Sequence, residues 1–401
     1  MCAMPAQTVI VVGAGVYGVT AALSLSRRGY AVSLFDPGPL PHPLAASTDI
    51  SKVVRLDYGP DEAYMALMET ALERWREWNT IWPQPLYHET GFLLLCPTPM
   101  APGEYEYESY QLLLHRGHRP ERLDAVAAGR RRYPLWQADQ YVDGYFNPEG
   151  GYAESGRVVA RLIEEAQRQG VRLFAGQKFE RVHEAGSRAA GIVTTAGEIF
   201  KADWIVTALG AWTPHLLPFT QDFFRSTGMP VFHLQPANRE FFQPEHFPVF
   251  NADISHTGYY GFPLNREGVV KIANHGIGRE MSPESAERVV TVEETEQLRD
   301  FLRGALPDLA DAPIVYTRVC LYCDTWDGHF WIARDPQREG LIIAAGDSGH
   351  GFKFAPVLGD IIADAVEGAP NPLLHKFRWR PEVHPAHSEE AARHKRMAGG
   401  R

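Results

Sequence analysis

The first 36 residues constrain the fold more than any other part of the chain. An apolar strand predicted over residues 8–12 runs directly into the turn Gly13-Ala14-Gly15-Val16-Tyr17-Gly18, which a predicted helix over 19–28 follows. A second strand over 31–35 then ends at Asp36. This is the GxGxxG pattern in its strand, turn, helix, strand setting, with an acid about twenty residues after the glycines. The pattern predicts a parallel α/β sheet with a dinucleotide site.

Three glycines and one acid of this motif have separate predicted roles. Gly13 permits the tight turn, Gly15 lets a pyrophosphate approach the backbone, and Gly18 allows helix and strand to pack closely. Asp36 is placed to accept hydrogen bonds from the ribose hydroxyls of an adenosine. A glycine-rich turn without a ligand is the alternative, and the motif by itself does not distinguish FAD from NAD.

A second glycine-rich loop lies near the end of the chain. The apolar run 341–345 predicts a strand that opens into the loop 346–351, and Pro356 then starts a helix. Backbone N–H groups, the helix dipole and the charge of Lys353 together predict an anion-binding corner. Another strand, over 203–208, stops at the turn that contains Gly210, where small residues let backbone lie against a cofactor.

The composition excludes several classes of protein. With 401 residues, 45% apolar and 22% charged, the chain is long enough for two globular domains. A net charge of −10 argues against a nucleic-acid partner, and no segment approaches the roughly 20 apolar residues that span a bilayer. The first residues lack the pattern of a signal peptide, and four cysteines form no disulfide framework, so we expect a cytoplasmic protein.

The predicted dinucleotide-binding domain is interrupted twice. It comprises residues 1–80, 148–218 and 318–385, whereas 81–147 and 219–317 form a substrate domain on a mixed or antiparallel sheet, and 386–401 a flexible tail. In the substrate domain we expect aromatic strands over 241–250, 258–263 and 268–273, and a helix over 292–306. The fold class is therefore α/β, and a nucleotide domain in three pieces favours an FAD enzyme over a simple NAD dehydrogenase.

Six short motifs, in their order and spacing, resemble one family. They are GAGVYG at 13–18, KVVRLDYG at 52–59, YGFP at 260–263, Lys271 with His275, CLY at 320–322 and SGHGFKFAP at 348–356. Over nearly its whole length the chain is similar to the D-amino-acid-oxidase-like FAD oxidoreductases. Within them it resembles the branch of monomeric sarcosine oxidase, N-methyltryptophan oxidase, pipecolate oxidase and the fructosyl-amino-acid oxidases.

The resemblance implies a covalent flavin. In that branch the cysteine that opens the CxY run carries FAD through a thioether, and this position is Cys320 here. The alternative is a redox or zinc pair with Cys323, but zinc needs about four ligands and the chain has no second CxxC. On a strand, residues 320 and 322 share one face and 323 lies on the other, so we expect Cys320 and Tyr322 to face the site together.

The resemblance also implies roles for basic residues. Arg55 and Lys353 bind a substrate carboxylate, and Tyr260 is a further substrate-binding residue. Lys271 matches a lysine whose fixed cation beside the flavin stabilises superoxide as it forms. Lys52 lies against the flavin at a position where the family often has arginine; lysine keeps the charge but loses the planar fork.

The candidate site therefore contains two sets of residues. The expected catalytic residues are Lys271, His275, Tyr322 and His350, where the two histidines match ones that line the family's active site. The expected FAD-binding residues are Gly13, Gly15, Val16, Tyr17, Gly18, Asp36, Ser51, Lys52, Gly210, Cys320, Gly346, Gly349, Gly351, Phe352 and Lys353, and no metal is expected.

The reaction implied by the resemblance is oxidation of the secondary amine of an N-substituted or cyclic α-amino acid to an imine, with O2 reduced to H2O2. A flavin dehydrogenase that passes electrons to a quinone or protein is the alternative, and a nonenzymatic flavoprotein is a further one. We expect a monomer that acts on a small amino-acid-like substrate. The substrate stays open, because the aromatic residues Phe241, Phe242, Tyr259, Tyr260 and Phe262 are compatible with a large pocket or with a packed core.

Overall fold

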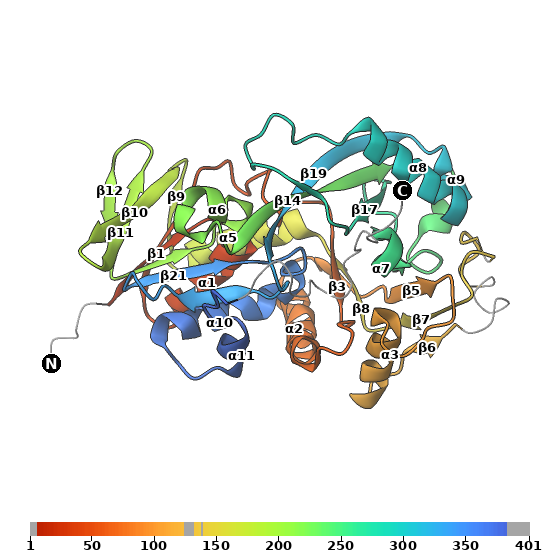
Figure 1. Ribbon diagram of the computed structural model, residues 1–401, viewed down its shortest axis with the longest axis horizontal. Helices are drawn as coiled ribbons and strands as arrows, with labels where there is room; N and C mark the ends of the chain where they lie inside the picture. The colour runs from red at the N-terminus through yellow and green to blue at the C-terminus, as the bar shows by residue number, and fades with distance from the viewer. Residues whose placement is uncertain (1–5, 124–131, 138, 383–401) are drawn as a thin grey trace. The chain divides into compact units, whose positions relative to one another are not determined.

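The computed structural model describes residues 6–123, 132–137 and 139–382, which Figure 1 shows as ribbons. The chain divides into two compact units. Among the described residues, unit 1 contains 6–52, 154–227 and 321–382, and unit 2 contains 53–123, 132–137, 139–153 and 228–320. Within the described ranges, no helix is long and apolar enough to cross a membrane. The functional domain limits and the tail over 386–401 stay predictions, and the tail lies outside the described residues.

Unit 1 is built on a six-stranded sheet in the order β20-β21-β13-β1-β2-β9. Its strands are β1 (Thr8–Val12), β2 (Ala31–Asp36), β9 (Arg172–Ala175), β13 (Trp204–Thr207), β20 (Trp331–Arg334) and β21 (Leu341–Ala345). β1 pairs in parallel with β2 and β13, β2 with β9, and β13 with β21, whereas β20 is antiparallel to β21. This parallel core confirms the predicted α/β class.

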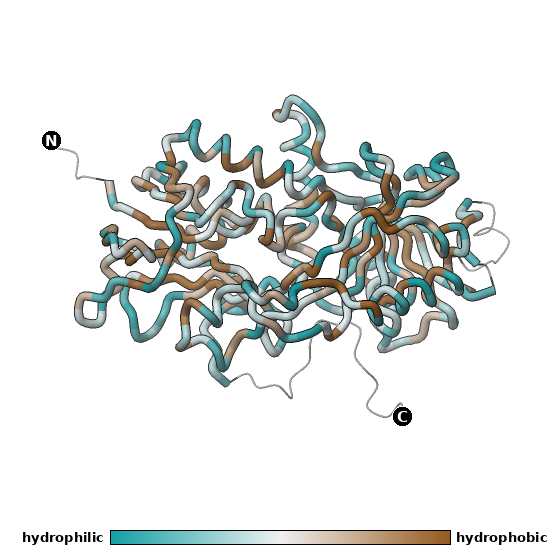
Figure 2. Tube along the Cα trace, turned by 90° about the horizontal axis from the view of Figure 1, so that it is seen from above, coloured by the Kyte–Doolittle hydropathy of each residue, from teal (hydrophilic) through white to brown (hydrophobic). Residues whose placement is uncertain are grey.

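Helices and a second sheet cover the strands of unit 1. Helix α1 (Val16–Arg27) contacts both α5 (Ser155–Arg168) and α10 (Ala355–Glu367). The antiparallel strands β10 (Phe179–Ala185), β11 (Arg188–Thr194) and β12 (Ile199–Lys201) form a small sheet, whose Phe179 and Ile192 share an apolar cluster with Ile10 and Ile205 of the large sheet. The central strands β1, β2, β13 and β21 are buried along nearly their whole length, which explains their continuous apolar runs. Figure 2 shows the hydropathy of the chain, with apolar segments in brown.

Unit 2 is built on a mixed sheet in the order β18-β14-β17-β16-β15-β5-β7-β6, with β19 paired to β14. Its strands are β5 (Phe92–Cys96), β6 (Glu121–Arg122), β7 (Asp143–Asn147), β14 (Phe224–Leu234), β15 (Val249–Ala252), β16 (Tyr259–Phe262), β17 (Val270–Asn274), β18 (Arg279–Glu280) and β19 (Ile314–Thr325). β15 is parallel to β5, and the neighbouring pairs β15-β16, β16-β17 and β5-β7 are antiparallel. The mixed sheet agrees with the expected fold class.

The two faces of this sheet differ in chemistry. One face belongs to an apolar cluster that includes Leu93, Phe250 and Ile272 together with Leu298 of helix α8 (Val292–Ala305) and Leu309 of α9 (Pro307–Ala310). Because side chains alternate along a strand, the residues between these lie on the other face. The strand register places Tyr145, Asn251, Tyr260, Phe262 and Lys271 there. This second face is the polar one.

A small sheet, helices α2 (Glu62–Ile81) and α3 (Tyr105–His115) and the short α7 (Ile254–Thr257) also belong to unit 2. The sheet has the order β3-β8-β4, with β3 (Lys52–Arg55), β4 (Tyr87–His88) and β8 (Gly150–Ala153). Helix α2 begins after Asp61, whose side chain accepts a hydrogen bond from the backbone N of Tyr64, and α3 follows later in the chain. Asp61 is thus the N-cap that stops α2 from extending into the preceding turn.

One predicted strand is wrong. Residues 241–250 do not form a continuous strand: a 3-10 turn over Arg239–Phe242 and a loop precede the short β15. Pro244 and Pro248 lie inside this stretch, and a proline has no N–H for a strand ladder. Its aromatic residues are nevertheless buried, since Phe242, Phe247 and Phe250 pack together in the core.

Candidate active site

The glycines of the first turn are required by close backbone approaches in unit 1. Gly13 has φ of +100°, and a Cβ there would lie 2.3 Å from Ala208 O at the end of β13. A Cβ at Gly18 would lie 1.8 Å from Gly13 O. Neither position therefore accepts a side chain, and α1 can start directly against the end of β1. The result is a backbone cradle at a helix N-terminus.

Polar side chains hold this cradle in place. Ala14 N donates to Asp36 Oδ2 at 2.8 Å, and Gly38 N donates to Asp36 Oδ1 at 2.9 Å. Val16 N, at the start of α1, donates to Ser47 Oγ at 3.1 Å. The sequence prediction gave Asp36 a ribose-binding role, and the carboxylate also orders the glycine turn itself. Ser47 was missed as a site residue, and a hydroxyl near the glycine motif is too common a signal to single it out.

The loop 346–353 reaches the first glycine turn within unit 1. A Cβ at Gly351 would lie 2.9 Å from the Tyr17 ring, and a Cβ at Gly349 would lie 2.3 Å from the Tyr322 ring. The loop then turns through Phe352–Phe354 into α10, so its backbone leads into a second helix N-terminus, as predicted. Lys353 is buried and its Nζ donates to His350 O at 3.1 Å. The structure thus brings Tyr17, Tyr322 and the 346–353 loop together.

Asp347 is a charged residue of this loop that the sequence prediction did not select. Its Oδ1 accepts a hydrogen bond from Cys323 N at 3.1 Å. Burial raises the pKa of the Asp347 carboxyl to about 6, and nearby Asp324 adds to this rise, whereas the charge of Lys52 opposes it. The charge of the predicted flavin-facing Lys52 therefore acts on a carboxyl of the 346–353 loop.

The His350 ring is held by neighbouring protein groups. Its Nε2 lies 2.9 Å from Gly328 O, and its ring stacks on Phe330 with 4.7 Å between centroids. A carbonyl oxygen only accepts, so Nε2 carries the proton in this arrangement. His350 therefore anchors the loop to the turn at Gly328, and its predicted catalytic role stays a prediction.

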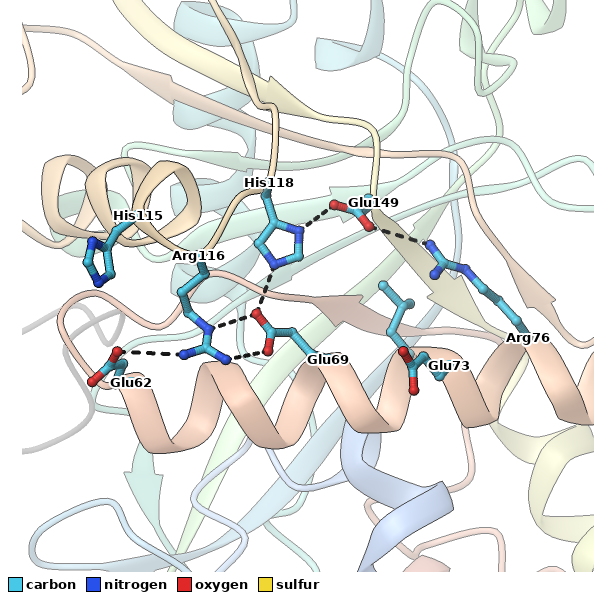
Figure 3. A pocket seen from close by; sticks show the side chains of 9 residues that line it. Glu62, Glu69, Glu73, Arg76, His115, Arg116, His118 and Glu149 are labelled. Carbon is cyan, nitrogen blue, oxygen red and sulfur yellow. Dashed lines mark hydrogen bonds and ion pairs between the residues drawn. The ribbon is translucent and has the colours of Figure 1, made fainter.

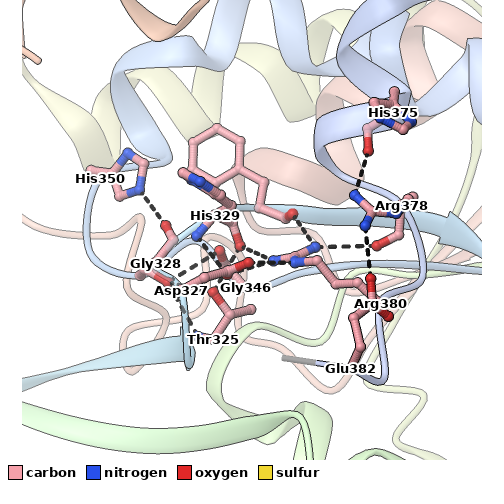
Figure 4. A network of polar contacts seen from close by, with 12 residues as sticks. Thr325, Asp327, Gly328, His329, Gly346, His350, His375, Arg378, Arg380 and Glu382 are labelled. Carbon is pink, nitrogen blue, oxygen red and sulfur yellow. Dashed lines mark hydrogen bonds and ion pairs between the residues drawn. The ribbon is translucent and has the colours of Figure 1, made fainter. Parts of the chain in front are cut away.

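A buried ion pair fixes the same turn, as Figure 4 shows. Arg380 donates from Nε to Asp327 Oδ2 at 2.6 Å and from Nη2 to Asp327 Oδ1 at 2.8 Å, and it also donates to His329 O and Phe330 O. Burial alone would raise the pKa of Asp327, but the Arg380 guanidinium outweighs burial and holds this pKa below its ordinary value. The chain segment around Arg380 thus supports the turn to which His350 is bonded.

Three predicted residues lie together in unit 2. Lys271 is 1% exposed, and its Nζ lies 4.7 Å from the centroid of the Phe262 ring. Tyr260 contacts Phe262 and, edge-on, His275, with ring centroids 5.8 and 6.5 Å apart. These residues occupy or border the polar face of the sheet. Tyr259 and Phe242 belong instead to the apolar core, and Phe241 is 40% exposed, so only part of the aromatic set borders this face.

Arg55 ends β3 and is linked to the same face through β8. Gly150 of β8 packs on Arg55, since a Cβ there would lie 3.6 Å from Arg55 Cα. Tyr152 of β8 contacts Phe262 edge-on, at 6.3 Å between centroids. The Arg55 side chain is 5% exposed, and its Nη1 donates to Tyr105 OH at 2.7 Å. Strand β8 therefore connects Arg55 to the polar face of the unit 2 sheet, which also carries the second buried cation, Lys271.

Strand β19 carries the cysteine pair and crosses from one unit to the other along the chain. Cys320 is the last residue of its segment in unit 2, and Tyr322 lies in unit 1. Cys323 belongs to the apolar cluster of unit 1, where burial raises the pKa of its thiol above the ordinary value. Among the described residues no group of three or more His, Cys, Asp or Glu side chains would hold a metal ion.

A separate charged pocket of about 420 Å³ lies in unit 2, shown in Figure 3. It is lined by Glu62, Glu69, Leu72, Glu73, Arg76, His115, Arg116, His118 and Glu149, none of which is a predicted site residue. His118 lies between two carboxylates, with Nε2 2.9 Å from Glu69 Oε1 and Nδ1 2.5 Å from Glu149 Oε2. This network ties helix α2 to the loop before β8.

Comparison with known proteins identifies the family. The family model described as FAD dependent oxidoreductase matches residues 8–365. L-saccharopine oxidase of Schizosaccharomyces pombe is 28% identical, covering 94% of each chain, and monomeric sarcosine oxidase of Bacillus sp. is 26% identical, covering 88% of this chain and 90% of that one. The crystal structure of fructosyl amine:oxygen oxidoreductase (amadoriase I) from Aspergillus fumigatus superimposes with a TM-score of 0.83 at 26% identity, covering 99% of this chain and 95% of that one.

The residues present fit an FAD. Gly13 and Gly18 let α1 start directly against the end of β1, and the loop 346–351 leads into α10, so both glycine turns end at helix N-termini, which suit a pyrophosphate. The family match over residues 8–365 and the likeness to solved structures agree with the resemblance carried by the sequence motifs. This chain belongs to the family of FAD-dependent oxidoreductases.

Proposed function

We propose that this protein is an FAD-dependent amine oxidase. It oxidises the secondary amine of an N-substituted or cyclic α-amino acid to an imine and transfers the two electrons and two protons to O2, which yields H2O2. The observation that carries this proposal is Lys271, a lysine that is 1% exposed and held over Phe262 on the polar face of the unit 2 sheet. A lysine cation held in a water-excluded place can stabilise the negative charge that develops on oxygen as it is reduced.

The chain's own residues bind and orient the reactants. Bound FAD supplies the two-electron acceptor for the amine. The glycine turns at Gly13 and Gly346 hold its phosphates, and Cys320 attaches its ring covalently in this proposal. Arg55 and Lys353 bind the substrate carboxylate, because both are buried cations with N–H groups that suit a carboxylate. Tyr260 and His275 border the space where the amine then lies.

The substrate class follows from the relatives and the cations together. The relatives are named for saccharopine, sarcosine and a fructosyl amine, which share a secondary amine. In this proposal Arg55 is a carboxylate clamp, a residue that binds the acid group of the substrate. A secondary amine together with such an acid group is the skeleton of an N-substituted amino acid. We retain the monomeric state and the cytoplasmic location as predictions from the sequence.

A peroxide assay on the purified protein tests this function. The panel contains N-methylglycine, N-methyl amino acids with larger side chains, proline and pipecolate. Two matched controls are glycine, which has a primary amine, and the amide of N-methylglycine, which lacks the carboxylate. We expect peroxide from at least one secondary amino acid and at least tenfold less from its amide, the loss of one charge-assisted contact. Equal rates with acid and amide would contradict the carboxylate clamp.

A further inference from the structure

The side chain of Arg55 is held by a short chain of hydrogen bonds. Arg55 Nη1 donates to Tyr105 OH at 2.7 Å, and Tyr105 OH donates to the backbone O of Asp57 at 3.0 Å. The Tyr105 proton is thus committed to the carbonyl, which leaves the phenol oxygen as the acceptor for the guanidinium. Tyr105 begins α3 and is 7% exposed, so this contact is dry and fixed by the fold.

Two aromatic rings add to the orientation of Arg55. Arg55 Cζ lies 5.2 Å from the centroid of the Tyr58 ring and 5.7 Å from that of Tyr105. These are cation–π distances, and the planar guanidinium suits such faces. A hydrogen bond and two rings together restrict the rotamers of a side chain that is otherwise highly flexible.

Asp57 lies on the same side of the chain as Arg55 but has few partners of its own. Its side chain is fully buried, Oδ1 accepts a hydrogen bond from Tyr145 OH, and Oδ2 has no hydrogen-bond partner among the described residues. An ionised carboxylate buried with a single hydrogen bond is strongly disfavoured, whereas the neutral acid is much less so.

The charges around Asp57 do not make the ionised form of its carboxyl group favourable. Burial raises the pKa of the Asp57 carboxyl, and this outweighs the opposing effects of Arg55, the Tyr145 hydroxyl and, at longer range, His118. Burial also raises the pKa of Tyr145 well above its ordinary value, so the phenol keeps its proton and donates it.

We propose that Tyr105 is a positioning residue for Arg55 and that the carboxyl group of Asp57, which accepts a hydrogen bond from Tyr145, is protonated and therefore neutral. Tyr105 aims the guanidinium, and an uncharged Asp57 leaves its positive charge undiminished for the carboxylate of the substrate. This inference rests on the proposed role of Arg55 in carboxylate binding. An ionised Asp57 would compete with the substrate for the same cation.

The test compares the inhibition constants of acetate and acetamide, two ligands of similar size that differ in charge, against the best amine substrate. In the FAD-loaded protein we expect acetate to bind about tenfold more tightly or better. Tyr105→Phe keeps the ring and removes the hydroxyl, so it should lower this preference about fivefold to tenfold and raise KM with kcat changed by less than about twofold. Tyr133→Phe is the matched control, because Tyr133 is a buried tyrosine of the apolar cluster whose ring contacts Phe146 and Arg132.

Asp57→Asn tests the protonation state, because an amide has the shape and neutrality of the protonated acid. We expect the preference for acetate to persist within about threefold. If Asp57 is ionised in the native protein, the substitution deletes a negative charge beside Arg55, and the variant should then bind acetate at least ten times more tightly than the native protein does. Should this variant fail to load FAD, Tyr145→Phe takes its place: a native neutral acid predicts a preserved preference, whereas tighter acetate binding would contradict the proposal.

Arg55→Ala separates this inference from the proposed function. If Arg55→Ala abolishes the preference for acetate while Tyr105→Phe leaves it intact, the positioning role of Tyr105 is wrong and the carboxylate clamp stands. If Arg55→Ala leaves the preference unchanged, the clamp itself is wrong, and the positioning role falls with it.

Discussion

Substitution of Lys271 by methionine isolates the oxygen half-reaction. Methionine keeps an unbranched apolar stem that can pack on Phe262 and deletes the charge. With Lys271 1% exposed, an effective dielectric constant of about 20 and a separation of about 5 Å between the ammonium and the charge on reduced oxygen give an interaction of about 3 kcal/mol. This equals roughly a 10²-fold change in rate.

The assay is stopped-flow spectroscopy of the FAD absorbance in two steps. Anaerobic mixing with the amine gives the rate of reduction, and mixing of the reduced protein with dissolved O2 gives the rate of reoxidation. Lys271→Met should slow reoxidation about 10²-fold and reduction by much less, whereas Lys201→Met, at an exposed position of β12, should change neither. If both steps slow equally, Lys271 has a structural or substrate-binding role, and an unchanged reoxidation rate removes it from the oxygen site.

Four further predictions follow from the geometry. Arg55→Ala should cost about 2–4 kcal/mol of transition-state stabilisation, calculated from kcat/KM for an amino-acid substrate in initial-rate assays. A substrate amide should show no comparable loss. Cys320→Ser should release the flavin into the supernatant after acid precipitation, whereas the unmutated protein keeps it in the pellet. Gly18→Ala should destabilise the fold by about 1–3 kcal/mol in denaturant melts, because its Cβ meets Gly13 O, while Gly304→Ala in α8, with open space around it, should stabilise by about 0.5–1 kcal/mol. Burial lowers the pKa of His118, but its hydrogen bonds to Glu69 and Glu149 outweigh burial and raise this pKa above the ordinary value. The unmutated protein should therefore have a higher free energy of unfolding than His118→Asn. This difference should be full below about pH 6.5 and disappear as pH rises through the folded-state pKa of His118.

Local patterns predicted the elements that depend on local sequence. The strands at Thr8–Val12 and Leu341–Ala345 have the predicted limits, because apolar runs bounded by glycine turns leave little choice of boundary. Helix α8 begins one residue after Thr291, whose capping box with Glu294 is readable from the sequence. The strand over 241–250 was wrong because aromatic content outweighed two prolines in that prediction.

Contacts between residues that are far apart in the chain could not be predicted from the sequence. Tyr145 donates to Asp57 across 88 positions, and Arg380 pairs with Asp327 across 53. No spacing rule connects such residues, since the sheet register and the packing of the loops decide which side chains meet. The cations Arg55, Lys271 and Lys353 were selected because short motifs surround them, and Asp57 lies inside one of those motifs without having been selected. Tyr105 and Ser47 lie in sequence that is ordinary for a helix start or a loop.

The stoichiometry of oxygen use tests the amine-oxidase assignment most directly. With the best secondary amino acid of the panel, oxygen uptake and H2O2 release are measured in the same sample, beside anaerobic reduction of the bound FAD. We predict complete reduction of FAD by the amine and one H2O2 for each O2 consumed. Reduction of FAD by the amine followed by rapid reoxidation only with an artificial quinone would contradict the account and assign a dehydrogenase.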